Sequence, residues 1–227
     1  MRSKMPAITA LLPMRHNSER VLGKNYRPFG DGRALFEHVL SNLLDCKNIN
    51  KVVINTDSAA IKDICINKYP SVIIHDRPKN LCDGHIAMNE IIMNDLQQLD
   101  GEYFLQTHST NPLVKSKRFD EAVEKFFENR QSYDSLFSVT RLQTRLWDQL
   151  ARPLNHNKDI LIRTQDLPPI YEENSCFYLF PRGTIEKEKL RIGKRPMLFE
   201  LNKLEAIDID DEVDFEIAQQ LFMIGNS

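Results

Sequence analysis

Glycine and cysteine are scarce in this chain, and both shortages exclude classes of protein. Among 227 residues there are 8 glycines and 4 cysteines. The glycines form neither the G-x-x-x-x-G-K-[ST] pattern of a Walker loop nor the G-x-G-x-x-G dinucleotide fingerprint. The cysteines are scattered without a C-x-x-C pair, so the sequence indicates neither a zinc site nor a disulfide framework. We expect reduced thiols in a cytoplasmic protein.

Long apolar runs and an excess of positive charge are also missing. The formal net charge is -2, so any anion site has to be local rather than part of a basic field for nucleic acid. No apolar run approaches the roughly 18 residues that span a bilayer. The charged start leads into only a short apolar run, which argues against a signal peptide. We therefore expect neither nucleic acid nor a membrane among the partners.

Short β-branched runs alternate with helical patterns along most of the chain. The predicted strands are residues 7–12, 52–54, 72–74, 103–105, 136–139 and 176–180. The predicted helices lie around residues 35–44, 61–65, 88–99, 119–127 and 213–222. This alternation predicts an α/β protein whose mostly parallel sheet has helices on both faces. Ligands of such sheets bind in loops beyond the carboxyl ends of the strands, where this sequence places its unusual polar residues.

The alternation breaks between residues 140 and 171. This stretch holds four arginines, three prolines and the single tryptophan of the chain. Its apolar side chains would be hard to bury on a small sheet, and an apolar excursion of this kind usually packs against something else. We interpret it as a hairpin arm inserted in a single domain of residues 1–227.

A basic loop follows the first predicted strand. Residues 13–25 read Pro-Met-Arg-His-Asn-Ser-Glu-Arg-Val-Leu-Gly-Lys-Asn. A triphosphate needs converging positive donors, which Arg15, Arg20 and Lys24 can supply. Ser18 adds a hydroxyl and Asn25 an amide. The alternative is an ordinary solvated loop, because runs of charge are often just solvated faces.

This run resembles the R-x-x-S-x-[KR]-x-x-x-K-N signature of the CMP-N-acylneuraminate cytidylyltransferases. Their relatives, the CMP-Kdo synthetases, carry a shorter form of it. The resemblance implies that Arg15 and Lys24 hold the phosphates of CTP and act in catalysis. It also implies that Ser18 and Arg20 support them, and that Asn25 lies near the ribose and phosphates.

Two more loops resemble nucleotide-binding segments of that family. Asn55-Thr56-Asp57 resembles its S-T-D, which implies a nucleotide contact for Asp57; capping of the next helix is the alternative. Arg77-Pro78, with Leu81 and Asp83, resembles the R-P-x-x-L-x-x-D loop that grips cytosine, and implies nucleotide contacts for Arg77 and Asp83. The loop is one residue shorter here and carries Cys82–His85 in place of small and hydroxyl residues, so strict cytosine selection does not follow.

The remaining matches concern the acceptor sugar. The stretch from Leu105 to Leu113 resembles an expanded L-Q-P-T-S-P-L, which implies that Gln106 binds the acidic sugar. Asn174 opens a segment similar to N-G-x-x-Y, with serine in place of glycine, and is implied to bind the substrate. Arg163 lies at the spacing of the family's arm arginine, which is implied to meet the sugar carboxylate across a homodimer boundary. His108 is a candidate general base only by position.

An acidic run near the C-terminus is the strongest single signal. Asp208-Ile209-Asp210, followed by Asp214, matches the family's D-I-D-x-x-x-D. Residues two apart in an extended segment point to the same side, so Asp208 and Asp210 can present two carboxylates to Mg²⁺, with triphosphate oxygens and waters completing its shell. The alternative is that the acidic residues cap the last helix, a role that suits Asp211 and Glu212.

The resemblance spans residue 7 to about residue 221. It implies a Rossmann-like fold of the nucleotide-diphospho-sugar transferase type, with residues 140–171 as a protruding dimerisation arm. The implied reaction is magnesium-dependent transfer of CMP from CTP to the anomeric hydroxyl of a sialic-acid-like 2-keto sugar, with release of pyrophosphate. Two alternatives stay open. One is the same fold acting on a Kdo-type sugar acid or a phosphonate, and the other is a catalytically weak nucleotide-binding regulator.

Overall fold

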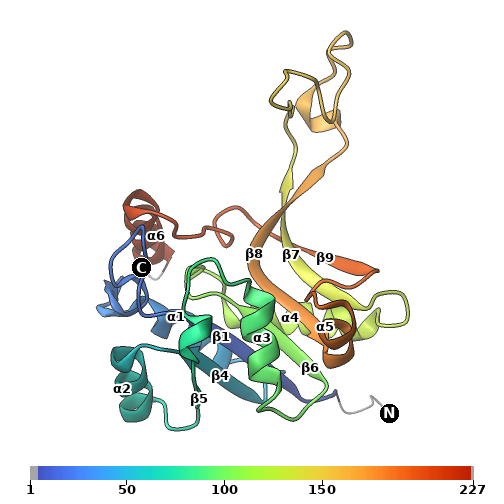
Figure 1. The fold of residues 1–227 in the computed structure, drawn as a ribbon. Coiled ribbons are helices and arrows are strands. Elements are labelled where there is room, and N and C mark those ends of the chain that lie inside the picture. Colours follow the sequence, from blue (N-terminus) through green and yellow to red (C-terminus); the bar gives the residue numbers. More distant parts are fainter. Residues whose placement is uncertain (1–4, 226–227) are drawn as a thin grey trace.

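A seven-stranded sheet forms the centre of the computed structural model, which describes residues 5–225 (Figure 1). In order across the sheet the strands are β5 (Ile73–Asp76), β4 (Lys51–Thr56), β1 (Ile8–Met14), β6 (Tyr103–Thr107), β8 (Ile170–Pro181), β7 (Ser135–Leu142) and β9 (Pro196–Leu201). Neighbouring strands pair in parallel, except that β8 runs antiparallel to β6 and β7. The predicted mostly parallel sheet is therefore confirmed.

Helices cover both faces of this sheet, as predicted. They are α1 (Leu35–Leu44), α2 (Ala59–Lys68), α3 (Met88–Leu96), α4 (Ser116–Glu128) and α5 (Arg182–Glu188). Side chains of a strand alternate between faces. Accordingly, Ala10 and Leu12 of β1 join the large apolar cluster with α1, α2 and α4, whereas Leu11 joins a second cluster with α3 and α5. Among the described residues, no helix is long and apolar enough to cross a membrane.

The last helix, α6 (Glu212–Gly225), packs on the segment that follows the basic loop (Figure 1). This segment contains the two-stranded ribbon of β2 (Pro28–Phe29) and β3 (Arg33–Ala34). Phe29 meets the ring of Phe215 edge-on at 5.4 Å. Gly30 has a φ of 57°, and a Cβ there would lie 2.3 Å from the Phe222 ring. Glycine is therefore required for α6 to approach this turn.

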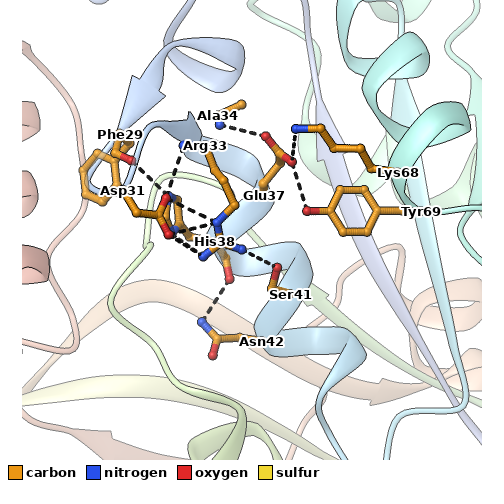
Figure 2. Close-up of polar contacts among 10 residues, drawn as sticks. All are labelled: Phe29, Asp31, Arg33, Ala34, Glu37, His38, Ser41, Asn42, Lys68 and Tyr69. Carbon is orange, nitrogen blue, oxygen red and sulfur yellow. Dashed lines mark hydrogen bonds and ion pairs between the residues drawn. The ribbon is translucent and has the colours of Figure 1, made fainter. Parts of the chain in front are cut away.

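A polar cluster joins the start of α1 to the end of α2 (Figure 2). The buried carboxylate of Glu37 accepts hydrogen bonds from Ala34 N at 2.8 Å, Lys68 Nζ at 3.1 Å and Tyr69 Oη at 3.0 Å. Burial opposes the charge on Glu37, but these bonds hold its pKa below the usual value. Both helices contact the short 3-10 turn η1 (Lys24–Tyr26), so the cluster stabilises the platform on which Lys24 is placed.

Residues 143–169 project from the sheet as an arm between β7 and β8 (Figure 1). The arm contains a β-bridge between Trp147 and Pro153 and a 3-10 turn, η3 (Thr164–Asp166). Its exposed large apolar side chains are Trp147, Leu150, Leu154, Ile160, Leu161 and Ile162. The predicted excursion is present, although β7 and β8 extend into both of its ends. Its role in dimer formation stays a prediction.

Some element boundaries differ from the prediction. Strand β1 continues past Pro13 to Met14. Its pairing with β6 ends at Leu11, so Pro13 lies where β1 has a neighbour on one side only, a position that tolerates a residue without an N–H. Helix α5 and strand β9 had no counterpart in the prediction.

Candidate active site

The carboxyl ends of four parallel strands bring the predicted loops together. The loops after β1, β4, β5 and β6 begin with Arg15, Asp57, Arg77 and His108. Strand order reverses between β1 and β6, the usual place for a ligand crevice in such sheets. A hollow of about 570 Å³ opens at this edge. The predicted site residues that line it are Arg15, Ser18, Arg20, Lys24, Asn25, Arg77, Asp83 and Asp210.

Lys24 is a buried cation of the site. Gly23 adopts the left-handed conformation, with φ 64°, and starts the turn that carries Lys24. The Lys24 ammonium donates to the backbone oxygen of Ile209, between the two predicted metal ligands. Burial lowers the pKa of Lys24, and the negative charges of Asp208 and Asp210 offset part of that effect. The two carboxylates therefore favour the charged form of Lys24 against the effect of burial.

Arg15 and Arg20 stand at the mouth of the hollow. Arg15 Nη1 lies 3.4 Å from Glu19 Oε1, and Arg20 Nη2 lies 2.5 Å from Asp210 Oδ1. All four side chains are partly exposed, and such surface pairs contribute little stability, so both guanidinium groups can turn toward a phosphate. A Cβ on Gly84 would lie 2.5 Å from Arg15 Nη1 and 2.6 Å from Glu19 Oε1, so a larger residue there would displace these two side chains.

Both polar atoms of the Asn25 side chain are hydrogen-bonded to other residues of the protein. Its Nδ2 donates to the backbone oxygen of Arg15 at 2.9 Å, and its Oδ1 accepts from Ser109 Oγ at 2.7 Å. The amide therefore fixes the basic loop to the end of β6. A further contact of Asn25 with the ribose or phosphates stays a prediction.

Asp57 also secures the basic loop. Its Oδ1 accepts a hydrogen bond from His16 N at 2.7 Å, and the residue lies outside the lining of the hollow. The alternative interpretation, in which Asp57 caps α2, is wrong because Ser58 is the N-cap, its hydroxyl accepting from Ile61 N. Direct contact between Asp57 and a nucleotide stays a prediction.

Arg77 is held by a buried chain of hydrogen bonds. Its Nε donates to Asn55 Oδ1 at 2.6 Å, and its Nη2 donates to the Asn55 backbone oxygen at 3.1 Å. Asn55 Nδ2 donates in turn to Asp95 Oδ1 at 2.7 Å, which lies 2.8 Å from His75 Nδ1. The chain fixes the Arg77 guanidinium at the wall of the hollow. Sequence reasoning missed His75 and Asp95; the only signal was an asparagine where the family has serine.

The segment Cys82–His85, which departs from the family pattern, forms another part of the rim. Asp83 Oδ1 accepts from His85 N at 2.8 Å, so the carboxylate shapes this turn. Both residues line the hollow. Burial raises the pKa of the Cys82 thiol, with a further contribution from the charge of Asp57. Contact between this segment and a cytosine base stays a prediction.

Asp208 carries a carboxylate oxygen that lacks a partner. Its Oδ1 is buried and has no hydrogen bond within the described part of the chain. Burial raises the pKa of Asp208, as does the charge of Asp210, whereas the nearby Thr110 side chain lowers it. An orphaned buried oxygen needs an explanation such as an ion, and hard carboxylate oxygens suit Mg²⁺. The two carboxylates therefore fit a cation. Within residues 5–225 no group of three His, Cys, Asp or Glu side chains forms a complete metal cage.

The neighbouring acidic residues have a structural role. Asp211 Oδ1 accepts from Asp214 N at 3.0 Å, and Asp214 Oδ2 accepts from Asp211 N at 3.2 Å. These reciprocal bonds form a cap at the start of α6. The prediction that Asp211 caps the last helix is therefore confirmed.

Gln106 is fully buried and lies outside the lining of the hollow. Its Oε1 accepts from Arg191 Nη1 at 2.8 Å, and its Nε2 donates to the Thr107 backbone oxygen at 2.9 Å and to His108 Nε2 at 3.0 Å. Burial, followed by the positive charges of Arg191 and Lys24, lowers the pKa of His108 to about 3. Such a weak base is poorly matched to proton transfer near neutral pH, so the lowered pKa does not favour His108 as a general base.

Asn174 lies outside the lining of the hollow. Its Oδ1 accepts from Ser138 Oγ at 2.6 Å, and its Nδ2 donates to Thr140 Oγ1 at 3.1 Å. It therefore joins β7 to β8 where their register shifts. The next residue, Ser175, has a φ of 58°, which explains physically why a glycine suits this position in the family pattern.

Arg163 lies on the arm. Its Nε donates to Asp166 Oδ2 at 2.7 Å and its Nη2 to Asp166 Oδ1 at 3.2 Å. The side chain is exposed and is not part of the lining of the hollow. Within one chain, the structure does not bring Arg163 to the predicted site.

Comparison with known proteins gives consistent matches. A sequence family described as Cytidylyltransferase matches residues 9–226. The N-acylneuraminate cytidylyltransferase A of Danio rerio is 28% identical, over 96% of this chain and 51% of its own length. The CMP-N,N'-diacetyllegionaminic acid synthase of Legionella pneumophila is 26% identical, over 96% of this chain and 97% of its own length. The chain thus spans about half the length of the fish protein and nearly all of the bacterial one.

A solved structure matches the fold along the whole chain. It is a CMP:2-keto-3-deoxy-manno-octonic acid synthetase complexed with CTP, with a TM-score of 0.72 and 12% identity. The match covers 97% of this chain and 99% of that one. At this identity the likeness shows the fold alone.

Proposed function

The chain belongs to the cytidylyltransferase family, and from that premise we propose that it transfers CMP from CTP to the anomeric hydroxyl of an acidic 2-keto sugar. The resemblance to the sialic acid enzymes, first based on motifs, is confirmed by relatives of that name. The proposed acceptor is a nonulosonate of the sialic or legionaminic type. A Kdo-type acid or a phosphonate remains the second acceptor class. The free cysteines suit a cytoplasmic setting.

The observation that supports this proposal best is the composition of the hollow. Arg15, Arg20, Lys24 and Arg77 all line it. Three cations close together suit a triphosphate, while a rigidly held guanidinium suits the edge of a base. We assign the phosphates to the first group and cytosine to Arg77, with Ser18, Asn25 and Asp83 around them.

Asp208 and Asp210 are the proposed ligands of Mg²⁺. The support is the orphaned Oδ1 of Asp208 and the second carboxylate two residues later. Mg²⁺ bound there would supply positive charge to the triphosphate. Asp210 would exchange its contact with Arg20 for the cation, and Arg20 would then be released to the phosphates.

The chemical step is a displacement at the α-phosphorus of CTP. The anomeric oxygen of the sugar forms the new phosphorus–oxygen bond, the bond to the bridging oxygen breaks, and pyrophosphate leaves with that electron pair. The hydroxyl proton passes to solvent. Lys24 and Arg15 neutralise charge on the phosphates, so catalysis depends on positioning and electrostatics.

We further propose that two chains form a homodimer through their arms. The support is the row of exposed apolar side chains on the arm, which includes Trp147 and Leu161. In this dimer the arm of one chain would reach the acceptor site of the other. Arg163 and Asn174 stay assigned to the substrate on the resemblance alone.

Pyrophosphate release tests the proposed activity. The purified chain is incubated with Mg²⁺, each of the four ribonucleoside triphosphates, and a panel of N-acetylneuraminic acid, a legionaminic acid, Kdo and a phosphonate. We expect release only with CTP and a 2-keto sugar acid. A chain that binds CTP tightly but releases nothing with any acceptor would be the regulator instead.

A further inference from the structure

A second hollow adjoins the nucleotide hollow. It has a volume of about 280 Å³ and is lined by Met88, Asn89, Glu173, Leu190, Arg191 and Ile192. Met88 lines both hollows, so a ligand of the second one would lie next to a nucleotide in the first. The motifs discussed above do not include Arg191, which lies between α5 and β9.

Arg191 is held in a fixed position at this second hollow. Its guanidinium stacks 3.7 Å above the ring of Tyr178. Its Nη1 donates to Gln106 Oε1 at 2.8 Å. A guanidinium carries five N–H donors in a planar fork, so this bond leaves donors for a planar anion. The residue is only partly buried, which gives a ligand access to it.

A hydrogen-bonded chain connects Arg191 to the nucleotide hollow. Because Arg191 requires an oxygen from Gln106, the amide nitrogen of Gln106 faces His108 and donates to its Nε2 at 3.0 Å. That nitrogen of His108 accepts, so the ring proton lies on Nδ1. His108 lines the first hollow. The chain from Arg191 to His108 therefore joins the two hollows.

The second hollow is lined by one positive and one negative side chain. Glu173 lies on its wall together with Arg191, and the Tyr178 hydroxyl donates to the Glu173 carboxylate. A ligand with one carboxylate and several hydroxyl or amide groups matches this pattern. Its carboxylate would face Arg191, and its hydrogen-bond donors would face Glu173.

We propose that Arg191 is a specificity-determining residue that binds the carboxylate of the acceptor within the same chain that binds the nucleotide. This inference rests on the proposed function. It identifies the Arg191 guanidinium as the group that recognises the carboxylate of the sugar. Planar guanidinium and carboxylate groups can share two parallel hydrogen bonds. The role of Gln106 is to orient Arg191 through the hydrogen bond to its side-chain oxygen.

The test compares a sugar acid with its uncharged methyl ester. The acceptor that gives the fastest pyrophosphate release is assayed together with its methyl ester, and the acid-to-ester ratio of kcat/KM is measured. The variant Arg191→Met keeps an apolar side chain over Tyr178 but removes the charge. We expect it to lower the ratio by about 10-fold or more, the effect of one lost charge-assisted contact, while the KM for CTP stays unchanged.

Three variants complete the test. Arg191→Lys should recover part of the ratio because it restores the charge. Arg195→Met, exposed in the same loop, is the control and should keep the wild-type ratio, whereas Arg163→Met distinguishes Arg191 from a carboxylate contact made by the arm of a second chain. The inference would be overturned if Arg191→Met kept the wild-type acid-to-ester ratio of kcat/KM. It would also be overturned if Arg163→Met lowered that ratio and Arg191→Met did not. A wild-type chain inactive with every sugar acid would instead defeat the proposed function.

Discussion

Arg77 and Asn55 are joined by two hydrogen bonds, one to the side-chain oxygen of Asn55 at 2.6 Å and one to its backbone oxygen at 3.1 Å. Both residues are buried. A long, flexible arginine therefore presents a single orientation to the hollow, and Asp95 fixes the asparagine from behind. Such support lowers the entropy that the arginine loses when it binds a ligand.

The first prediction concerns this support. Asn55→Ala should raise the KM for CTP by roughly tenfold and leave kcat within about threefold, because the guanidinium still reaches the base but is no longer fixed. Loss of the hydrogen bond from Asn55 to Asp95 should lower the free energy of unfolding by about 1–3 kcal/mol. Asp76→Asn, which removes only an exposed ion pair with Lys62, is the control. A fall in kcat with an unchanged KM would contradict the positioning role.

The second prediction concerns the metal. Asp208→Asn keeps the shape of the side chain but removes its charge, so we expect the fold to persist and Mg²⁺ binding to the CTP complex to be lost. Calorimetric titration of Mg²⁺ into protein and CTP measures this directly. Asp211→Ala should cost about 1 kcal/mol of stability through the lost helix cap and retain Mg²⁺ binding. Equal Mg²⁺ affinity in Asp208→Asn and the wild type would show that Asp208 is not a ligand.

The third prediction concerns the buried cation. Lys24→Met should lower kcat/KM for CTP by more than about tenfold, because one charge-assisted contact is worth roughly 1.5–3 kcal/mol. Lys51→Met, exposed at the first residue of β4, is the matched control. Steady-state kinetics of both variants decides the outcome. Similar losses in the two would mean that only the overall charge of the protein matters.

The fourth prediction concerns pH. The unfolded chain binds a proton at His108 below about pH 6.5, but the folded chain does so only near pH 3. Unfolding therefore takes up a proton between these values, and stability falls as the pH falls through this window. Between pH 7 and pH 5.5 the wild type should lose about 1.3 kcal/mol more than His108→Gln. Denaturant unfolding measures this difference.

His85 supplies the control for the pH measurement. It is exposed, so His85→Gln should retain the pH dependence of the wild type. If His108→Gln loses stability on acidification as steeply as the wild type, His108 is not held neutral in the folded chain.

The fifth prediction concerns the arm. Leu161 is 88% exposed, and Leu161→Glu would place a charge in the proposed contact between chains. We expect a dimer for the wild type and a monomer for the variant by sedimentation, with an unchanged thermal midpoint at low protein concentration. Lys158→Glu, on the same arm and also exposed, should stay dimeric. A monomeric wild type would rule the arm contact out.

Periodicity predicted the parts of the fold that have strong local patterns. In α4 the buried residues Phe119, Ala122, Val123 and Phe126 recur at helical spacing. In β9 the alternation of Met197, Phe199 and Leu201 is equally regular, but it covers six residues after a run of mixed charge and was missed. The short strand β5 at the other edge was predicted from its run Val72, Ile73 and Ile74. A short strand is therefore found where β-branched residues are consecutive, and missed where only the alternation marks it.

The sequence predicted the parts of the candidate site that lie in local motifs. It did not predict the parts that depend on contacts between residues far apart in the sequence. The basic loop and the acidic run each carry their signal within a few residues. Arg191 has no such signal, because its partner Gln106 lies 85 positions away. Asn25 and Asp57 illustrate the opposite case, since their motif positions were found but the structure uses their side chains to fix the loop.

Phosphorus NMR of one reaction mixture tests the central claim most directly. The mixture contains the chain, Mg²⁺, CTP and N-acetylneuraminic acid or, if that is inert, the legionaminic acid. We predict that the three CTP signals are replaced by one phosphodiester signal of a CMP-sugar and one pyrophosphate signal in equal molar amounts. Appearance of CMP or CDP with free phosphate, or unchanged CTP with every sugar acid, would contradict nucleotidyl transfer to an acidic sugar.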